Sequence, residues 1–273
     1  MRDASVGFQC PECIAEGQRG SRTARTSYGG RMPINVSATS LVLIGLNVAV
    51  WLAVTLTGRF TSPLYSLLAL RSRGVCVEGD RYYPNVPDAD VCRLVTPGEW
   101  YPGVSEGGYW QLLTSGFVHV DPIHLLFNCF FIYMIGPQLE ALFGRLRFLA
   151  VYLVSLLSGS VLVYWLAGTT DSTLGASGAA YGMMAGLLVV MLRRRLDARQ
   201  LLFLIVANTA ITFLVPGISW QGHLGGFIGG ALTAAVLVYA PAGPHRARYQ
   251  GLGVAAIAVA IAVLVAVRTL TLV

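Results

Sequence analysis

The chain has 273 residues, of which 55% are hydrophobic and only 12% charged, and its mean hydropathy is +0.64. Soluble domains carry about one-quarter charged residues, so this composition excludes an ordinary soluble protein and predicts an integral membrane protein. All 19 positive charges are arginines, and their placement in the loops accounts for the net charge of +6 without a nucleic-acid partner.

Residues 1–36 are polar and rich in arginine, and they show no signal-peptide pattern. We expect a flexible N-terminal segment on the cytoplasmic side. Cys10 and Cys13 form C-P-E-C there, which is half of a possible zinc ribbon. No second ligand pair lies in the same compartment, so we expect no bound metal and keep the zinc half-site as the alternative.

Apolar stretches of about 17 to 25 residues predict membrane-spanning helices. Seven such stretches follow in chain order, at 37–57, 121–143, 148–167, 173–192, 200–216, 219–240 and 251–270. The sequence therefore predicts an all-α, polytopic membrane protein with one long loop at about 58–120.

Arginines cluster before the first span and after the second, fourth and sixth, whereas the short loops 168–172 and 217–218 contain none. By the positive-inside rule, the N-terminus is then cytoplasmic and the long loop 58–120 lies outside. We expect a multi-pass protein of the cell membrane, in a bacterial plasma membrane. Cys76 and Cys92 share the outer loop, and a disulfide between them is plausible if that compartment is oxidising.

Polar side chains recur near the outer ends of three spans. His124 and Asn128 share one helical face of the second span, Ser177 and Tyr181 share one face of the fourth, and His223 lies near the outer end of the sixth. All three spans begin at the same membrane face, so at 1.5 Å per residue these groups lie within about 10 to 12 Å of it. Their common depth predicts a single polar cluster.

The fourth and sixth spans carry G-x-x-x-G steps, a pattern that lets two helix backbones approach closely in lipid. The glycines are Gly178, Gly182 and Gly186, then Gly225, Gly226, Gly229 and Gly230. Contact between these spans brings Ser177 within reach of His223, which are the nucleophile and general base of acyl transfer. No acidic residue occupies the outer half of a span, so we expect a Ser-His dyad with Tyr181 positioning the imidazole.

Donors for an oxyanion are also present. Ser177 lies in the first turn of its helix, where free backbone N–H groups and the positive end of the dipole favour negative charge. The His124 and Asn128 side chains add further donors.

Together these residues form motifs in four separated segments. They are G-A-S-G (Gly175 to Gly178), Tyr181, H-x-x-G-x-x-x-G (His223, Gly226, Gly230), H-x-x-x-x-H-x-x-x-N (His119, His124, Asn128) and E-x-x-x-G (Glu140, Gly144). The sequence resembles the rhomboid family of intramembrane serine proteases. The resemblance covers residues 37–240, a six-helix core, and residues 241–273 look like the linker and added seventh helix of the "six plus one" members.

The resemblance implies that Ser177 is the nucleophile, His223 the base, and His124, Asn128 and the Ser177 amide the oxyanion-hole donors. Gly175, Gly178, Gly226, Gly230, Tyr181 and His119 are expected to support them. The resemblance also implies cleavage of single-pass membrane proteins in or beside their transmembrane segment, without metal or cofactor. The expected partners are those substrates and the lipid bilayer; the substrate's identity and the oligomeric state stay open. One departure is Gln111 after Trp110, where family members often have arginine.

Two other functions are compatible with a polar cluster in a membrane. A non-proteolytic rhomboid-like protein that binds transmembrane helices would be expected to lack Ser177 or His223, and both are present. A transporter would continue the polar path toward the cytoplasmic half of the fourth and sixth spans, where small and apolar residues stand instead. The G-x-S-x-G elbow of soluble hydrolases is excluded, because position 179 is alanine.

Overall fold

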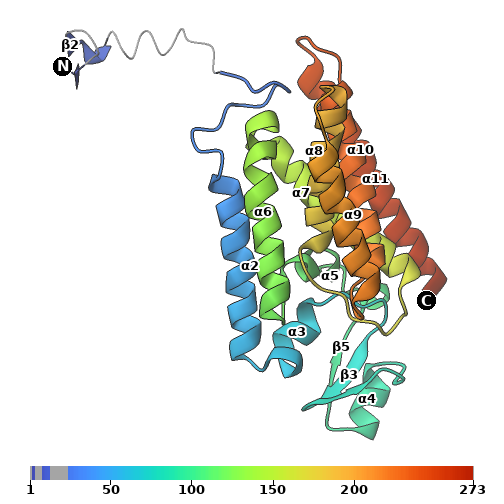
Figure 1. Ribbon diagram of the computed structural model, residues 1–273. Helices are drawn as coiled ribbons and strands as arrows, with labels where there is room; N and C mark the ends of the chain where they lie inside the picture. The colour runs from blue at the N-terminus through green and yellow to red at the C-terminus, as the bar shows by residue number, and fades with distance from the viewer. Residues whose placement is uncertain (1, 4–7, 13–23, 273) are drawn as a thin grey trace.

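The computed structural model describes residues 2–3, 8–12 and 24–272. Long helices run side by side to form a bundle, and a small lobe containing strands lies at one end (Figure 1). Each predicted span corresponds to one of these helices: α2 (Ala38–Leu56), α6 (Pro122–Phe143), α7 (Arg145–Leu166), α8 (Ser177–Arg193), α9 (Arg199–Leu214), α10 (Trp220–Tyr239) and α11 (Arg246–Leu272).

The remaining elements are short. They are β1 (Arg2–Asp3), β2 (Phe8–Gln9), η1 (Arg59–Thr61), α3 (Pro63–Leu68), β3 (Val75–Glu78), β4 (Arg81–Tyr83), α4 (Ala89–Val95), β5 (Glu99–Tyr101), η2 (Val104–Glu106), α5 (Gln111–Thr114) and η3 (Ser115–Phe117), where η denotes a 3-10 helix. All but β1 and β2 belong to the long loop between α2 and α6.

Five helices, α2, α6, α7, α10 and α11, are long and apolar enough to cross a membrane, while α8 and α9 have only 17 and 16 residues. The protein is therefore a multi-pass membrane protein. The predicted start of the fourth span at 173 is wrong, because Thr173 pairs with Leu70 in an isolated antiparallel bridge and α8 begins only at Ser177. Likewise α9 ends at Leu214 rather than 216, since residue 215 precedes Pro216 and is extended.

Glycines bring α7, α8 and α10 into backbone contact, which confirms the predicted approach of the fourth and sixth spans. A methyl group on Gly226 or Gly230 of α10 would overlap the carbonyl of Gly178 or Gly182 of α8. On the other side, a methyl group on Gly159 of α7 would lie 2.7 Å from the α10 carbonyl at residue 222. Such close packing replaces the hydrophobic effect as the source of helix association in lipid.

The outer loop forms a three-stranded antiparallel sheet in the order β4-β3-β5 (Figure 1). A disulfide joins Cys76 in β3 to Cys92 in α4, as the shared loop suggested. Gln111 is fully buried and joins separate parts of this loop: its side-chain oxygen accepts from the Arg71 N–H at 3.1 Å, and its side-chain NH2 donates to the Pro102 carbonyl at 2.8 Å. Gln111 thus braces the loop at the position where arginine is frequent in the resembled family.

Part of the N-terminal segment packs against the opposite end of the bundle. Within the described residues 24–36, the Tyr28 side chain is buried and its ring lies 5.2 Å from that of Phe143. Cys13, the second cysteine of the possible zinc half-site, lies outside the described residues. Within the described ranges, no group of three or more histidine, cysteine, aspartate or glutamate residues is placed to hold a metal ion.

Candidate active site

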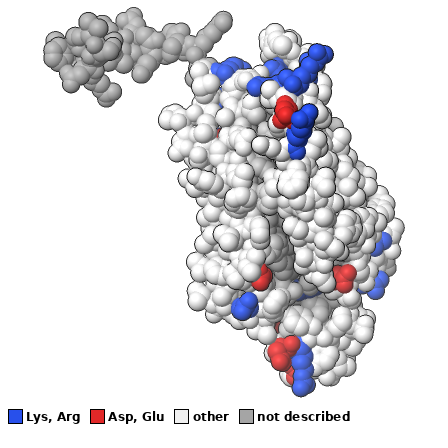
Figure 2. All heavy atoms as spheres, viewed as in Figure 1, with Lys and Arg blue, Asp and Glu red and all other residues white. Residues whose placement is uncertain are grey.

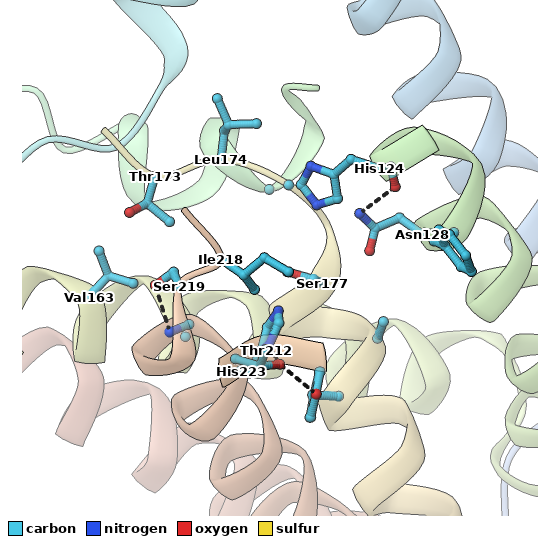
Figure 3. Close-up of a pocket in the computed structure, with 18 of the residues that line it drawn as sticks. His124, Asn128, Val163, Thr173, Leu174, Ser177, Thr212, Ile218, Ser219 and His223 are labelled. Carbon is cyan, nitrogen blue, oxygen red and sulfur yellow. Dashed lines mark hydrogen bonds between the residues drawn. The ribbon is translucent and has the colours of Figure 1, made fainter. Parts of the chain in front are cut away.

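A cavity of about 630 Å³ lies between α6, α8, α9 and α10, at the end of the bundle that carries the outer loop. His124, Asn128, Ser177, Tyr181 and His223 all line it, and Figure 3 shows Ser177 and His223 facing the same space. The polar cluster predicted from a common depth is therefore a single site in space.

Ser177 is the first residue of α8, and the segment before it is held by backbone hydrogen bonds. The Thr173 N–H donates to the Leu70 carbonyl and the Gly175 N–H to the Ser115 carbonyl, both at 2.9 Å. Helix α8 then starts without a side-chain cap. The N–H groups of its first turn are therefore free of intrahelical partners and point toward the cavity end of the helix.

His223 lies in the first turn of α10. Ser219 caps this helix, its hydroxyl accepting from the Gly222 N–H at 3.2 Å. The imidazole stacks on the Tyr181 ring, with ring centroids 4.2 Å apart and planes inclined by 15°. Tyr181 thus lies parallel to the imidazole and restricts the plane of that ring.

Thr212 of α9 provides a hydrogen-bond partner for His223 that the sequence did not reveal. Its Oγ1 lies 2.8 Å from Nδ1 of His223, 3.1 Å from the Tyr181 hydroxyl and 2.8 Å from the Asn208 carbonyl. A carbonyl only accepts, so the single hydroxyl hydrogen of Thr212 goes to Asn208, and Oγ1 accepts from Tyr181 and from His223. Nδ1 of His223 then carries the hydrogen, which leaves Nε2 unprotonated.

Close contact of α8 and α10 determines how near the two candidate residues lie. Gly178 follows Ser177 directly, and its carbonyl is the group that a side chain on Gly226 would overlap. No hydrogen bond joins the Ser177 hydroxyl to the His223 imidazole within the part of the chain that the structure describes. Nucleophile and base are commonly more distant in a free enzyme than in its substrate complex, so this spacing is compatible with acyl transfer.

His124 lies against the turn before the nucleophile. A side chain on Gly175 would come within 2.5 Å of Cε1 of His124, and Gly175 has φ +113°, which disfavours other residues. Glycine at 175 therefore serves two purposes, because it permits the turn into α8 and leaves room for the imidazole beside it.

Asn128 reaches the site with its amide hydrogens already in use. Nδ2 lies 3.1 Å from the His124 carbonyl and 3.1 Å from Nε2 of His119, a fully buried side chain behind the cavity wall. Nε2 of His119 also accepts from the Ala176 N–H at 3.3 Å. His119 thus ties Asn128 to the residue before Ser177, and it does not line the cavity itself.

Other predicted residues lie away from the cavity. Gly226 and Gly230 act through the helix contact described above. At the opposite end of the bundle, the fully buried Glu140 pairs with Arg145 at 3.2 Å and accepts from the Thr39 hydroxyl at 2.8 Å. The ion pair joins the end of α6 to the start of α7, and the Thr39 hydrogen bond ties both to the start of α2.

Comparison with known proteins adds independent information. Residues 106–240 match the family model for the rhomboid domain. The chain is 34% identical over 145 residues to "Rhomboid protease GluP" and 32% identical over 141 residues to "Putative rhomboid protease YdcA", both of Bacillus subtilis. It is 28% identical over 255 residues to "Rhomboid protease AarA" of Providencia stuartii.

The extent of these matches differs. They cover 51%, 50% and 83% of this chain, and 28%, 71% and 81% of the respective relatives. The first relative is thus much longer than the shared region, while the other two share most of their length with this chain.

Proposed function

This chain belongs to the rhomboid family of membrane proteases, and from that premise we propose that it is an intramembrane serine endopeptidase with a Ser177-His223 dyad. The observation that carries the proposal is the single cavity in which Ser177 at the start of α8 faces a His223 whose Nδ1 is held by Thr212. Its substrates are single-pass membrane proteins, cleaved in or beside their transmembrane segment.

The first chemical step uses the unprotonated Nε2 of His223. It takes the proton of the Ser177 hydroxyl while the serine oxygen bonds to the scissile carbonyl carbon, and the carbonyl oxygen becomes an oxyanion. His223 then gives that proton to the departing amine, the C–N bond breaks, and an ester to Ser177 remains. A water molecule hydrolyses the ester by the same proton route, which restores the serine.

The oxyanion is stabilised by the Ser177 N–H and by His124. The free N–H groups at the start of α8 suit negative charge because no intrahelical acceptor competes for them. Asn128 contributes only when its amide gives up one of its two present acceptors. We therefore assign Asn128 mainly to holding the His119 and Ala176 side of the site in place.

Thr212 and Tyr181 are positioning residues in this mechanism. Thr212 fixes the tautomer of His223 through Nδ1, and Tyr181 fixes the ring plane by stacking. Neither exchanges a proton with the substrate, because the Thr212 hydrogen is directed to the Asn208 carbonyl.

The site lies near the outer face of the membrane if the arginine-rich loops are cytoplasmic. The end of the bundle that carries the outer loop is then outside, and water reaches Ser177 through the cavity. In this arrangement residues 37–240 form the protease core, and residues 241–273 add the linker and the seventh helix.

Cleavage of a model single-pass substrate by the purified protein in liposomes tests the proposal. Ser177→Ala and His223→Ala are each expected to lower the rate by about 10⁴-fold or more, because the nucleophile or its base is lost. Ser37→Ala and His245→Ala are matched controls, since both residues lie away from the cavity. Substrate that binds to the wild type but stays uncut would instead favour a non-proteolytic helix-binding protein.

A further inference from the structure

A second cavity, of about 900 Å³, lies at the end of the bundle away from the candidate active site. Two segments line it: residues 25 and 29–34 of the N-terminal segment and residues 144–147, where α6 turns into α7. No acidic residue among those described lines the cavity. Four arginines do, namely Arg25, Arg31, Arg145 and Arg147. The cavity is therefore basic as well as roomy.

The positive charge around this cavity is mostly uncompensated. Arg145 alone has an acidic partner, Glu140, whereas the Arg147 guanidinium donates to the neutral Gln250 side chain at 2.7 Å. Within the described part of the chain, Arg25 and Arg31 make no ion pair. Figure 2 shows basic side chains gathered at this end of the molecule. Crowded like charges in one cavity favour an anionic ligand.

The local backbone holds the arginines over the cavity. Arg25 and Arg31 face each other in an antiparallel bridge, so their side chains leave the turn on the same side. The turn between them is tight, because the Thr26 hydroxyl accepts from the Gly30 N–H at 3.0 Å. Gly30 packs directly on the Phe143 carbonyl, which leaves no room for a side chain there. The turn is thus docked on the end of α6.

The start of α7 adds donors of its own. Gly144 precedes this helix without a side-chain cap, so the first backbone N–H groups of α7 lack intrahelical partners beside the arginines. Oriented N–H groups next to guanidinium forks are a common way to bind phosphate oxygens.

The rim of the cavity is apolar and exposed. Met32, Ile34 and Leu146 line the same cavity, with 58%, 106% and 81% of their surfaces accessible. A free phosphate would leave these side chains facing water, whereas acyl chains would cover them. The combination of a basic interior and an apolar rim therefore fits an amphiphile.

We propose that this cavity binds the phosphodiester headgroup of an anionic phospholipid, with Arg25, Arg31 and Arg147 around the phosphate and the acyl chains against Ile34 and Leu146. The bound lipid would join the N-terminal turn to the start of α7. The site lies at the membrane surface that the arginine pattern assigns to the cytoplasm, and it does not depend on the proposed catalysis.

The test uses the full chain in maltoside micelles that contain phosphatidylglycerol, with bound lipid counted by native mass spectrometry. Arg25→Gln with Arg31→Gln is expected to weaken retention of the lipid by about tenfold or more, because two cytoplasmic charges at the headgroup are lost. Arg195→Gln with Arg248→Gln removes the same charge from exposed arginines outside the cavity, and this control should retain the lipid.

Further measurements distinguish an anionic phospholipid from inorganic phosphate as the ligand. Phosphatidylcholine at the same mole fraction should be retained far less, and inorganic phosphate should not displace phosphatidylglycerol. Equal losses in the two double variants would overturn the proposal, since general surface charge would then explain binding. Displacement by inorganic phosphate would overturn it in favour of a free-anion site. Ile34→Ser with Leu146→Ser keeps every arginine, and it should lower lipid retention if the acyl contacts are real.

Discussion

Thr212→Val tests the role of the hydroxyl that holds His223. Valine has nearly the shape of threonine but leaves Nδ1–H of His223 and the Tyr181 hydroxyl without their shared acceptor. A buried donor that loses its acceptor costs about 1–3 kcal/mol. If that cost falls on the productive orientation of the imidazole, the rate should drop about 5- to 150-fold, since about 1.4 kcal/mol corresponds to tenfold.

The assay combines substrate cleavage with labelling of Ser177 by a small fluorophosphonate. The value of kcat and the labelling rate should fall together, because both need Nε2 of His223 as the base, while KM changes little. Thr212→Ser keeps the hydroxyl and should restore most of the activity. Thr209→Val is the matched control on the same helix, because the Thr209 hydroxyl donates only to the Ile205 carbonyl on an exposed face.

Two results would refute this reasoning. One is a Thr212→Val protein as active as Thr209→Val, which would mean that stacking on Tyr181 alone orients His223. The other is a Thr212→Ser protein as inactive as Thr212→Val, which would point to loss of packing instead of loss of a hydrogen bond. Isotope-edited NMR of the four histidines gives a direct check, since the tautomer of His223 should become mixed only in the valine variant.

Two further predictions concern the scaffold. Gly226→Ala should destabilise the protein by about 1–3 kcal/mol and lower activity, because the new methyl group overlaps the Gly178 carbonyl and forces α8 and α10 apart. Gly251→Ala is the control, since a methyl group there meets open space. Equal thermal unfolding temperatures of the two variants would contradict the helix contact. Replacing Cys76 and Cys92 by serine should lower the stability of the outer loop by about 3 kcal/mol, the value for a closed loop of this size. The loop should then be proteolysed faster. In the wild type, alkylation should add mass at both cysteines only after reduction.

The sequence predicted the bundle well because membrane helices leave strong local signals. Long apolar stretches predicted the seven helices, and glycine spacing predicted the contact between α8 and α10. Asp121 followed by Pro122 is a local signature of a helix start, and the Asp121 carboxylate accepts from the N–H groups of Ile123 and His124. Each of these features is encoded in neighbouring residues, which a single sequence displays directly.

Features that depend on distant parts of the chain were not predictable in this way. The fourth span was predicted to start at 173 because residues 173 to 176 belong to an uncharged stretch, whereas Thr173 pairs with Leu70 and Gly175 has φ +113°, outside the helical range. Gln111 was noted only as a departure from the family pattern and Arg71 only as a residue of the long loop, yet both side chains are buried and the Arg71 backbone N–H donates to Gln111. The segments that decide these conformations are far apart in sequence.

Thr212 escaped notice for a different reason. A threonine in a membrane helix normally bonds to the carbonyl four residues earlier, and Thr212 does so with Asn208, so the sequence offered a sufficient local explanation. Only the packing of α9 beside α8 and α10 shows that its oxygen also faces Tyr181 and His223. The sequence therefore accounts for the hydrogen bond of Thr212 within its own helix, and it gives no sign that the same oxygen also accepts from Tyr181 and His223.

A neutral partner for His223 also costs less desolvation free energy in a membrane than a charged partner would. Soluble serine proteases orient the histidine with a buried aspartate, which stabilises the imidazolium as well. A carboxylate at the position of Thr212 would lie among apolar helices, where an ionised group is costly unless it is paired. Threonine fixes the tautomer without any charge, at the cost of leaving the imidazolium less stabilised in the transition state. If the dyad acts as proposed, Thr212→Asp should therefore not improve catalysis, because the desolvation of the carboxylate would outweigh its attraction for the imidazolium.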